Sequence, residues 1–196
     1  MSDLEPRVRD LERQVGELTA ALRQMESMLA LVGDVQTYTH LRDLLLAGDL
    51  DGADRETARL MFEQLVNANG DVSPEALERC PAAVVLIIDE LWSGSCQGRQ
   101  GFGVQQRIYR DLGGTRESLV AQDTELFEQF TRAVAWPTVA DVGFALPEEL
   151  TVPVPAALDA HGSPPAGHLP MRCWAGDYGL KAANLLMARL IDVFGS

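Results

Sequence analysis

Histidine and cysteine side chains near the C-terminus are the first candidates for chemistry. His161, His168 and Cys173 are separated by seven and five residues, a spacing that matches no closed zinc pattern. His168 lies in Gly167-His168-Leu169-Pro170, where a neutral imidazole is well suited to hydrogen-bonding the loop backbone. We therefore predict a structural role for His168 and no metal site.

Nucleophilic and phosphate-binding chemistry have little support. Ser93-Gly94-Ser95-Cys96 contains no Gly-x-Ser-x-Gly elbow, and no general base is placed beside Cys96 by spacing. The glycine-rich residues 98–103 lack the lysine of a phosphate-binding loop. The sequence thus predicts a protein that is not an enzyme.

The acidic residues that follow Gly48 resemble the opening of a calcium loop. Counted from Asp49, position 5 is Ala53, position 6 is Asp54 and position 12 is Leu60, whereas an EF-hand needs a ligand, glycine and glutamate there. We exclude calcium and expect Asp51 or Asp54 to cap a helix that runs to about Asn67.

Composition sets the remaining limits. The 196 residues are 46% apolar and 23% charged, which is enough for one core with an appendage. A net charge of -13 argues against nucleic acid and anionic membrane surfaces. Three distant cysteines give no disulfide framework, and the longest apolar run, residues 82–88, is too short to span a bilayer. We expect a reduced, cytoplasmic protein.

The first 33 residues carry a heptad repeat. Their apolar positions alternate in steps of four and three, which predicts a coiled-coil helix that associates with a second copy through residues 4–32. A helix packed on its own domain is the alternative. The positions are Leu4, Val8, Leu11, Val15, Leu18, Leu22, Met25, Leu29 and Val32.

Helical periodicity dominates the rest of the chain. Apolar spacing predicts helices over residues 104–112, 118–134 and 180–194, and Ser73-Pro74-Glu75 is typical of a helix start. Residues 82–92 are rich in β-branched side chains, which favours a buried strand, but their length and preceding proline also fit a buried helix. Residues 137–170 are proline-rich and indicate a long ordered loop.

Large aromatic residues beside glycines suit a cleft for a flat ligand, because glycine lets the backbone approach closely. Leu91-Trp92, Gly101-Phe102-Gly103-Val104-Gln105 and Gly167-His168-Leu169-Pro170 occur in this order. Together with Gly48, Ala53, Asp54 and Thr57 they resemble the "genomes uncoupled four" family, the porphyrin-binding regulators of magnesium chelatase, over about residues 38–170. The alternative, which is favoured for Trp92 and Phe102 when each is taken singly, is that the aromatic is simply part of the core.

The resemblance implies an all-α fold, with residues 82–92 helical and one cupped helical domain over 34–196, and the heptad repeat adds the coiled-coil helix over 1–33. It also implies a non-enzymatic tetrapyrrole-binding regulator that needs no cofactor, whose ligand is a porphyrin or bilin and whose protein target is a chelatase or another protein. The ligand contacts it implies are Trp92, Arg99, Phe102, Gln105, Phe130, Trp136 and Arg172.

Two departures from the family pattern favour a second hypothesis. In the run from Phe130 to Trp136, Thr131 replaces a tryptophan that closes over the porphyrin in the family, and Ala135 replaces a glycine. Arg172 is the one arginine that follows the Gly-His-Leu-Pro phrase closely. The second hypothesis is an adaptor for protein–protein interaction that has lost tetrapyrrole binding.

Overall fold

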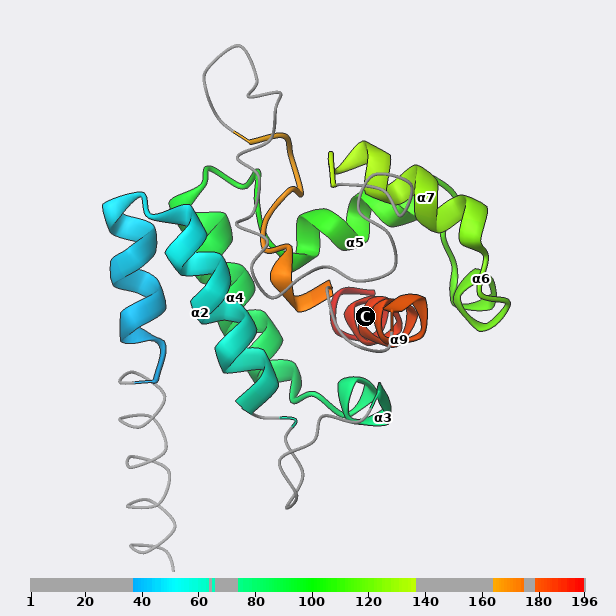
Figure 1. Cartoon of the computed structure of the whole chain (residues 1–196), viewed down its shortest axis with the longest axis horizontal. Helices are drawn as coiled ribbons and strands as arrows, with labels where there is room; N and C mark the ends of the chain where they lie inside the picture. The colour runs from blue at the N-terminus through cyan, green and yellow to red at the C-terminus, as the bar shows by residue number, and fades with distance from the viewer. Residues whose placement is uncertain (1–36, 64, 66–73, 137–163, 175–178, 196) are drawn as a thin grey trace, which may run out of the picture. The chain divides into compact units, whose positions relative to one another are not determined.

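The computed structural model describes residues 37–63, 65, 74–136, 164–174 and 179–195. The chain divides into two compact units, residues 1–40 and 41–196. All the helices labelled in Figure 1 belong to the second unit. Every regular element among the described residues is a helix, which confirms the predicted all-α class for them (Figure 1). The predicted coiled coil over residues 1–33 lies outside the described residues.

Helix α2 (Leu50–Glu63) follows a helix that ends at residue 47. Gly48 has a φ of 75°, and the next residue, Asp49, accepts a hydrogen bond at Oδ1 from the backbone N–H of Gly52, 2.9 Å away. The prediction that Asp51 or Asp54 caps this helix was therefore wrong. Both lie inside the first turns of α2, where Asp54 is buried and free to serve another partner.

Helix α4 (Ala82–Ser95) settles the ambiguity of residues 82–92 in favour of a helix. Its apolar side chains face α2, α5 (Phe102–Asp111) and α9 (Gly179–Phe194), and burial on several sides explains why β-branched residues are tolerated. Trp92 is fully buried, and its indole N–H donates to Thr57 Oγ1 at 2.9 Å. This bond fixes α4 against α2.

The predicted helix over residues 118–134 is two helices, α6 (Arg116–Val120) and α7 (Thr124–Ala133). The break falls where Gln122 adopts a φ of 53° and Asp123 caps α7 by accepting from Leu126 N–H at 3.0 Å. Apolar periodicity continues across the break, so spacing alone could not reveal it. The aspartate before Thr124 was the available signal.

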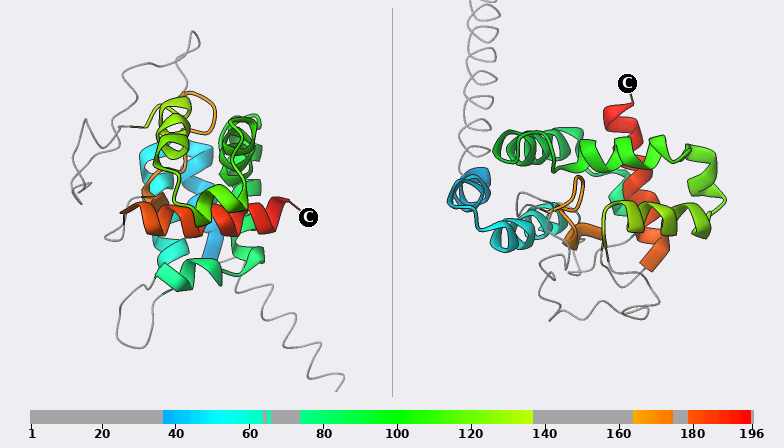
Figure 2. Two further views of the ribbon diagram at one scale, coloured as in Figure 1. Left: turned by 90° about the vertical axis from the view of Figure 1, so that its right-hand side faces the viewer. Right: turned by 90° about the horizontal axis from the view of Figure 1, so that it is seen from above.

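Helix α9 is the central element of the second unit. It contacts α3 (Pro74–Glu78), α4, α5, α6 and the short 3-10 helix η1 (Arg172–Trp174), and Figure 2 shows it crossing the other helices. Its buried face is mainly apolar, with the polar Asn184 among side chains that are almost inaccessible to solvent: Ala183, Leu186, Met187 and Leu190. No helix in the described part of the chain is long and apolar enough to cross a membrane.

Candidate functional site

Residues 167–174, here called the 167–174 segment, run through the interior beside the start of α5. Two backbone hydrogen bonds tie the segment to residues 99–101: Gly101 N–H donates to Leu169 C=O at 2.9 Å and Gly167 N–H to Arg99 C=O at 2.8 Å. Gly167 has a φ of 72°, and a Cβ there would meet Ile108 Cδ1 at 2.7 Å. Glycine at this position is therefore required by both backbone conformation and space.

Two buried glutamine amides satisfy the polar backbone of this segment. Gln105 donates through Nε2 to Gly167 C=O at 3.0 Å and to Pro170 C=O at 2.7 Å, and its Oε1 accepts from the Trp174 indole N–H at 3.1 Å. Gln100 accepts from Leu169 N–H at 2.8 Å and donates to Pro165 C=O at 2.9 Å. Because both side chains are almost fully buried, losing either would leave unpaired polar groups in the interior.

His168 and Trp136 join the end of α7 to the same segment. His168 Nδ1 lies 2.9 Å from Val134 C=O, and the Trp136 indole N–H donates to His168 C=O at 2.7 Å. Burial lowers the pKa of His168 below its usual value, so the imidazole is neutral at pH 7 and donates from Nδ1. The predicted hydrogen bond between His168 and loop backbone is confirmed.

An aromatic cluster lies next to these bonds, with Phe130 at its centre. The ring centroid of Phe130 is 5.3 Å from that of Trp136 and 5.8 Å from that of Tyr109, both edge-on, and 5.9 Å from that of Trp174. Trp136 and Trp174 are themselves 5.4 Å apart. Sequence reasoning missed Trp174, although its position shortly after the Gly-His-Leu-Pro phrase was a usable signal.

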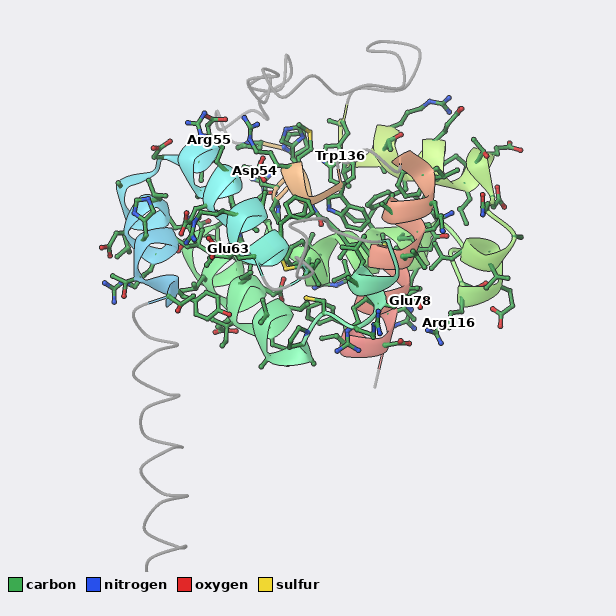
Figure 3. The ribbon with its side chains drawn as sticks, turned by 60° about the horizontal axis from the view of Figure 1, so that its bottom comes forward. Asp54, Arg55, Glu63, Glu78, Arg116 and Trp136 are labelled. Atoms are coloured by element: carbon green, nitrogen blue, oxygen red, sulfur yellow. The ribbon has the colours of Figure 1, made fainter. Side chains whose placement is uncertain are left out.

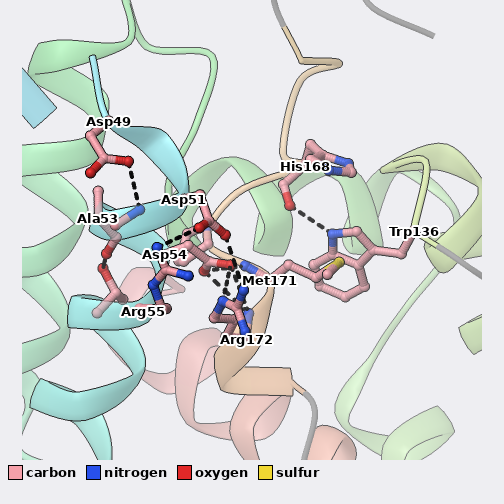
Figure 4. Close-up of polar contacts among 12 residues, drawn as sticks. Asp49, Asp51, Ala53, Asp54, Arg55, Trp136, His168, Met171 and Arg172 are labelled. Atoms are coloured by element: carbon pink, nitrogen blue, oxygen red, sulfur yellow. Dashed lines mark hydrogen bonds and ion pairs between the residues drawn. The ribbon is translucent and has the colours of Figure 1, made fainter. Parts of the chain in front are cut away.

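Asp54 anchors the other end of the segment to α2. Its Oδ1 accepts from Met171 N–H at 2.8 Å and from Arg172 N–H at 3.2 Å (Figure 4). Burial raises the pKa of Asp54 to about 6, and the hydrogen bonds from Arg172 and Met171 oppose that rise. Asp54 was known from the sequence only as part of a phrase, and its partners are more than one hundred residues away.

The guanidinium of Arg172 is held by carboxylates of α2. Its Nη2 lies 3.0 Å from Asp51 Oδ1, and its Nε lies 3.6 Å from Asp54 Oδ2. Arg55, labelled with Asp54 and Trp136 in Figure 3, pairs with the other oxygen of Asp51 at 2.6 Å. The arginine expected to meet a ligand carboxylate thus already has an internal carboxylate partner.

The structure brings together some of the predicted ligand contacts. Gln105, Phe130 and Trp136 surround the 167–174 segment, and Arg99 is half-buried beside it, with Nη2 3.5 Å from Pro164 C=O. Trp92 and Phe102 are fully buried in the helical core, so a ligand does not reach them in this conformation. A role for any of the seven residues in binding stays a prediction.

A separate cleft of about 480 Å³ opens between α5, α6 and the end of α9. None of the predicted ligand contacts lines it; the lining residues are Gln106, Arg110, Gly114, Thr115, Arg116, Ile191, Asp192 and Gly195.

Metal and thiol chemistry find no support among the described residues. No group of three histidine, cysteine, aspartate or glutamate side chains is placed there to hold a metal ion; His161 lies outside them. Cys96 is part-buried, and its burial raises the pKa of the thiol. A raised pKa lowers the thiolate fraction and with it nucleophilicity.

Comparison with known proteins gives a structural neighbour and a family. The structure of ligand-free GUN4 from Arabidopsis thaliana matches with a TM-score of 0.58 at 22% identity, covering 82% of this chain and 95% of that one. At this identity the likeness concerns the fold. Comparison with curated proteins gives no match. A model of the family described as GUN4-like matches residues 33–184, most of the sequence, and the chain therefore belongs to the GUN4-like family.

Proposed function

We propose that this protein is a non-enzymatic regulator that binds a flat tetrapyrrole, a porphyrin or a bilin, at the 167–174 segment. Membership of the GUN4-like family supports a tetrapyrrole-regulatory role at the level of the family. The observation that carries the proposal is the rigid support beneath this segment, where Gln100, Gln105 and Asp54 satisfy its backbone. Such support holds contact residues in place before a ligand arrives.

The ligand contacts we propose are of two kinds. Trp136 at the end of α7 supplies apolar contact, with Phe130 packed against it, and Phe102 and Trp92 lie in the core. Arg172 and Arg99 supply positive charge for the ligand's carboxylates, and Gln105 fixes the segment between them. Aromatic and guanidinium side chains around one segment suit a planar macrocycle that carries acidic side chains.

The adaptor hypothesis is favoured by two specific features. Thr131 stands where the family resemblance implies a tryptophan, and it directs its hydroxyl to Glu128 C=O at 2.9 Å. The Arg172 guanidinium is paired with Asp51. If the site takes no ligand, the same surface remains available to a protein target, a chelatase or another partner.

An absorbance and fluorescence titration separates the two hypotheses. Porphyrins and bilins added to the whole protein should shift the ligand band and quench tryptophan fluorescence with saturation below tens of micromolar, about 6 kcal/mol of binding free energy. Arg172→Glu should weaken this binding. No saturable change with any porphyrin or bilin would leave the adaptor as the better hypothesis.

We also propose that residues 4–32 associate two copies of the chain. The support is the strict alternation of nine apolar positions, and the helix lies outside the described residues. Light scattering on the full chain and on a chain that begins at Asp34 should give different masses. Leu11→Asp with Leu18→Asp should dissociate the full chain, because it places charge in a desolvated seam; an unchanged mass would exclude this seam.

A further inference from the structure

Asp51 lies between two arginines, and each of its carboxylate oxygens meets a different one. Oδ2 is 2.6 Å from Arg55 Nη2, and Oδ1 is 3.0 Å from Arg172 Nη2 (Figure 4). Two guanidinium groups on the two oxygens of one carboxylate form a recognition geometry for carboxylates in general. The two arginines are brought together from α2 and η1.

The contacts of Asp51 can be exchanged, whereas those of Asp54 cannot. The side chains of Arg55 and Asp51 are 57% and 36% exposed, and that of Arg172 is 19% exposed. Asp54 is fully buried and accepts from the backbone N–H groups of Met171 and Arg172. The Asp51–Arg55 pair is exposed and the Asp51–Arg172 pair is part-buried. Asp54 holds the backbone N–H of Arg172, so a departure of Asp51 would leave that backbone in place.

The two guanidinium contacts of Asp51 identify what would replace it. The protein carries a net charge of -13, which repels an acidic ligand unless cations are concentrated at the site. A ligand carboxylate that takes the place of Asp51 restores both guanidinium contacts, while the displaced Asp51 stays tethered to α2 and its charge opposes binding. A neutral or esterified group makes neither contact.

We propose that Arg55 and Arg172 form a carboxylate-binding clamp, which Asp51 occupies in the ligand-free protein and from which a carboxylate of the bound tetrapyrrole displaces it. This rests on the proposed function for the identity of the ligand. Asp51 then sets the affinity: it competes with every carboxylated ligand and leaves ligands without a free carboxylate unaffected.

The test compares Asp51→Asn with the wild type in titrations with protoporphyrin IX and with its dimethyl ester. The acid should bind about three- to tenfold more tightly to the variant, since an uncharged amide competes poorly for a guanidinium, and the ester should bind equally to both. Asp51→Ala should behave in the same way. Adding Arg55→Gln to Asp51→Asn should reverse the gain.

Asp192→Asn is the matched control. Asp192 pairs with Arg116 at 3.0 Å, and its side chain is 40% exposed, similar to that of Asp51. Asp192→Asn therefore changes the net charge by the same amount as Asp51→Asn, but away from the clamp. Equal gains in affinity for both variants would assign the effect to net charge and overturn the clamp. Wild-type affinity for the acid in Asp51→Asn would overturn it as well.

A second measurement keeps the clamp testable if no porphyrin binds and the proposed function fails. Glutarate added to isotopically labelled Asp51→Asn protein should shift the Arg172 Nε–H resonance with saturation, and should shift it less in the wild type. The Arg172→Lys variant assigns the resonance. The absence of a saturable shift in Asp51→Asn would overturn the clamp independently of any tetrapyrrole.

Discussion

The interior and exposed sides of the 167–174 segment are held by different kinds of interaction. On the interior side, buried glutamine, histidine and tryptophan side chains make neutral hydrogen bonds to backbone groups. On the exposed side, Arg172 makes ion pairs in which its main partner, Asp51, is reached by solvent. The difference separates what must stay fixed from what can exchange: buried bonds are costly to break, whereas exposed charge pairs change partner easily.

Gln105→Ala should break the interior side, with the largest effect on stability. The change removes the partner of Gly167 C=O, Pro170 C=O and the Trp174 indole N–H at once. Each buried group left unpaired costs about 1–3 kcal/mol, so we expect a loss of about 3–5 kcal/mol in urea unfolding. Gln129→Ala, at an exposed position of α7, is the control; equal losses would mean that the amide of Gln105 is not structural.

Asp54→Asn should change the pH dependence of stability at the boundary between the interior and exposed sides. Because burial raises the pKa of Asp54 to about 6 from 3.8, the folded protein binds more protons than the unfolded chain between these values. Wild-type stability should therefore fall as pH rises from about 4 to 6, by about 2–3 kcal/mol relative to Asp54→Asn. The measurement is urea unfolding of both proteins across this range.

The exposed Asp43→Asn serves as the control for that pH series. Its stability should run parallel to that of the wild type. If Asp54→Asn also runs parallel, Asp54 is ionised throughout, and the interior charge is fully compensated by its hydrogen bonds and by Arg172.

His168→Ala should weaken the interior side by about 1–3 kcal/mol, the cost of a lost buried hydrogen bond to Val134 C=O. Since burial lowers the pKa of His168 below 6.5, its share of the stability should also be lost as pH falls through about 6.5, where the unfolded chain takes up a proton. Unfolding at pH 7.5 and 5.5 measures both effects. Stoichiometric zinc that is lost with the substitution would contradict the structural role.

Thr131→Trp should act on ligand affinity alone and have the smallest energetic effect. Thr131 is half-buried near the end of α7, and an aromatic ring there should add about 0.5–1.5 kcal/mol of stacking on a flat ligand, about two- to tenfold in affinity. The porphyrin titration measures this. Gln129→Trp controls for nonspecific binding of the ligand to an added indole ring. Equal gains in affinity from the two substitutions would remove Thr131 from the site.

The sequence predicted the helices better than it predicted the hydrogen-bond partners of polar residues. Helix α4 was decided correctly because its length and family resemblance outweighed its β-branched content. The break between α6 and α7 was missed because a capping aspartate leaves apolar periodicity intact. A place in the core was the favoured interpretation for Trp92 and Phe102 taken singly, and their full burial confirms it. The full burial of Phe130 depends on helices that meet only in the fold.

The polar contacts of the site could not be predicted for a physical reason. Asp54 and Gln105 find their partners more than sixty residues away, and no local rule specifies which backbone groups a buried side chain must satisfy. Arg172 was predicted to contact a ligand. Its pairing with Asp51 depends on a three-dimensional approach between α2 and η1, which spacing along the chain does not encode.

Two sets of hydrogen bonds determine how this protein would respond to a cut in its chain. One joins Trp136 to His168, and the other joins Gln100 to Pro164 and Pro165. Residues 136 and 164 are the described neighbours of the stretch 137–163, and both are tied to the same body by buried side chains. A protease site or a foreign loop inserted between them would leave both anchors in place. We therefore expect a protease cut between residues 136 and 164 to leave both cut ends attached to the same folded body.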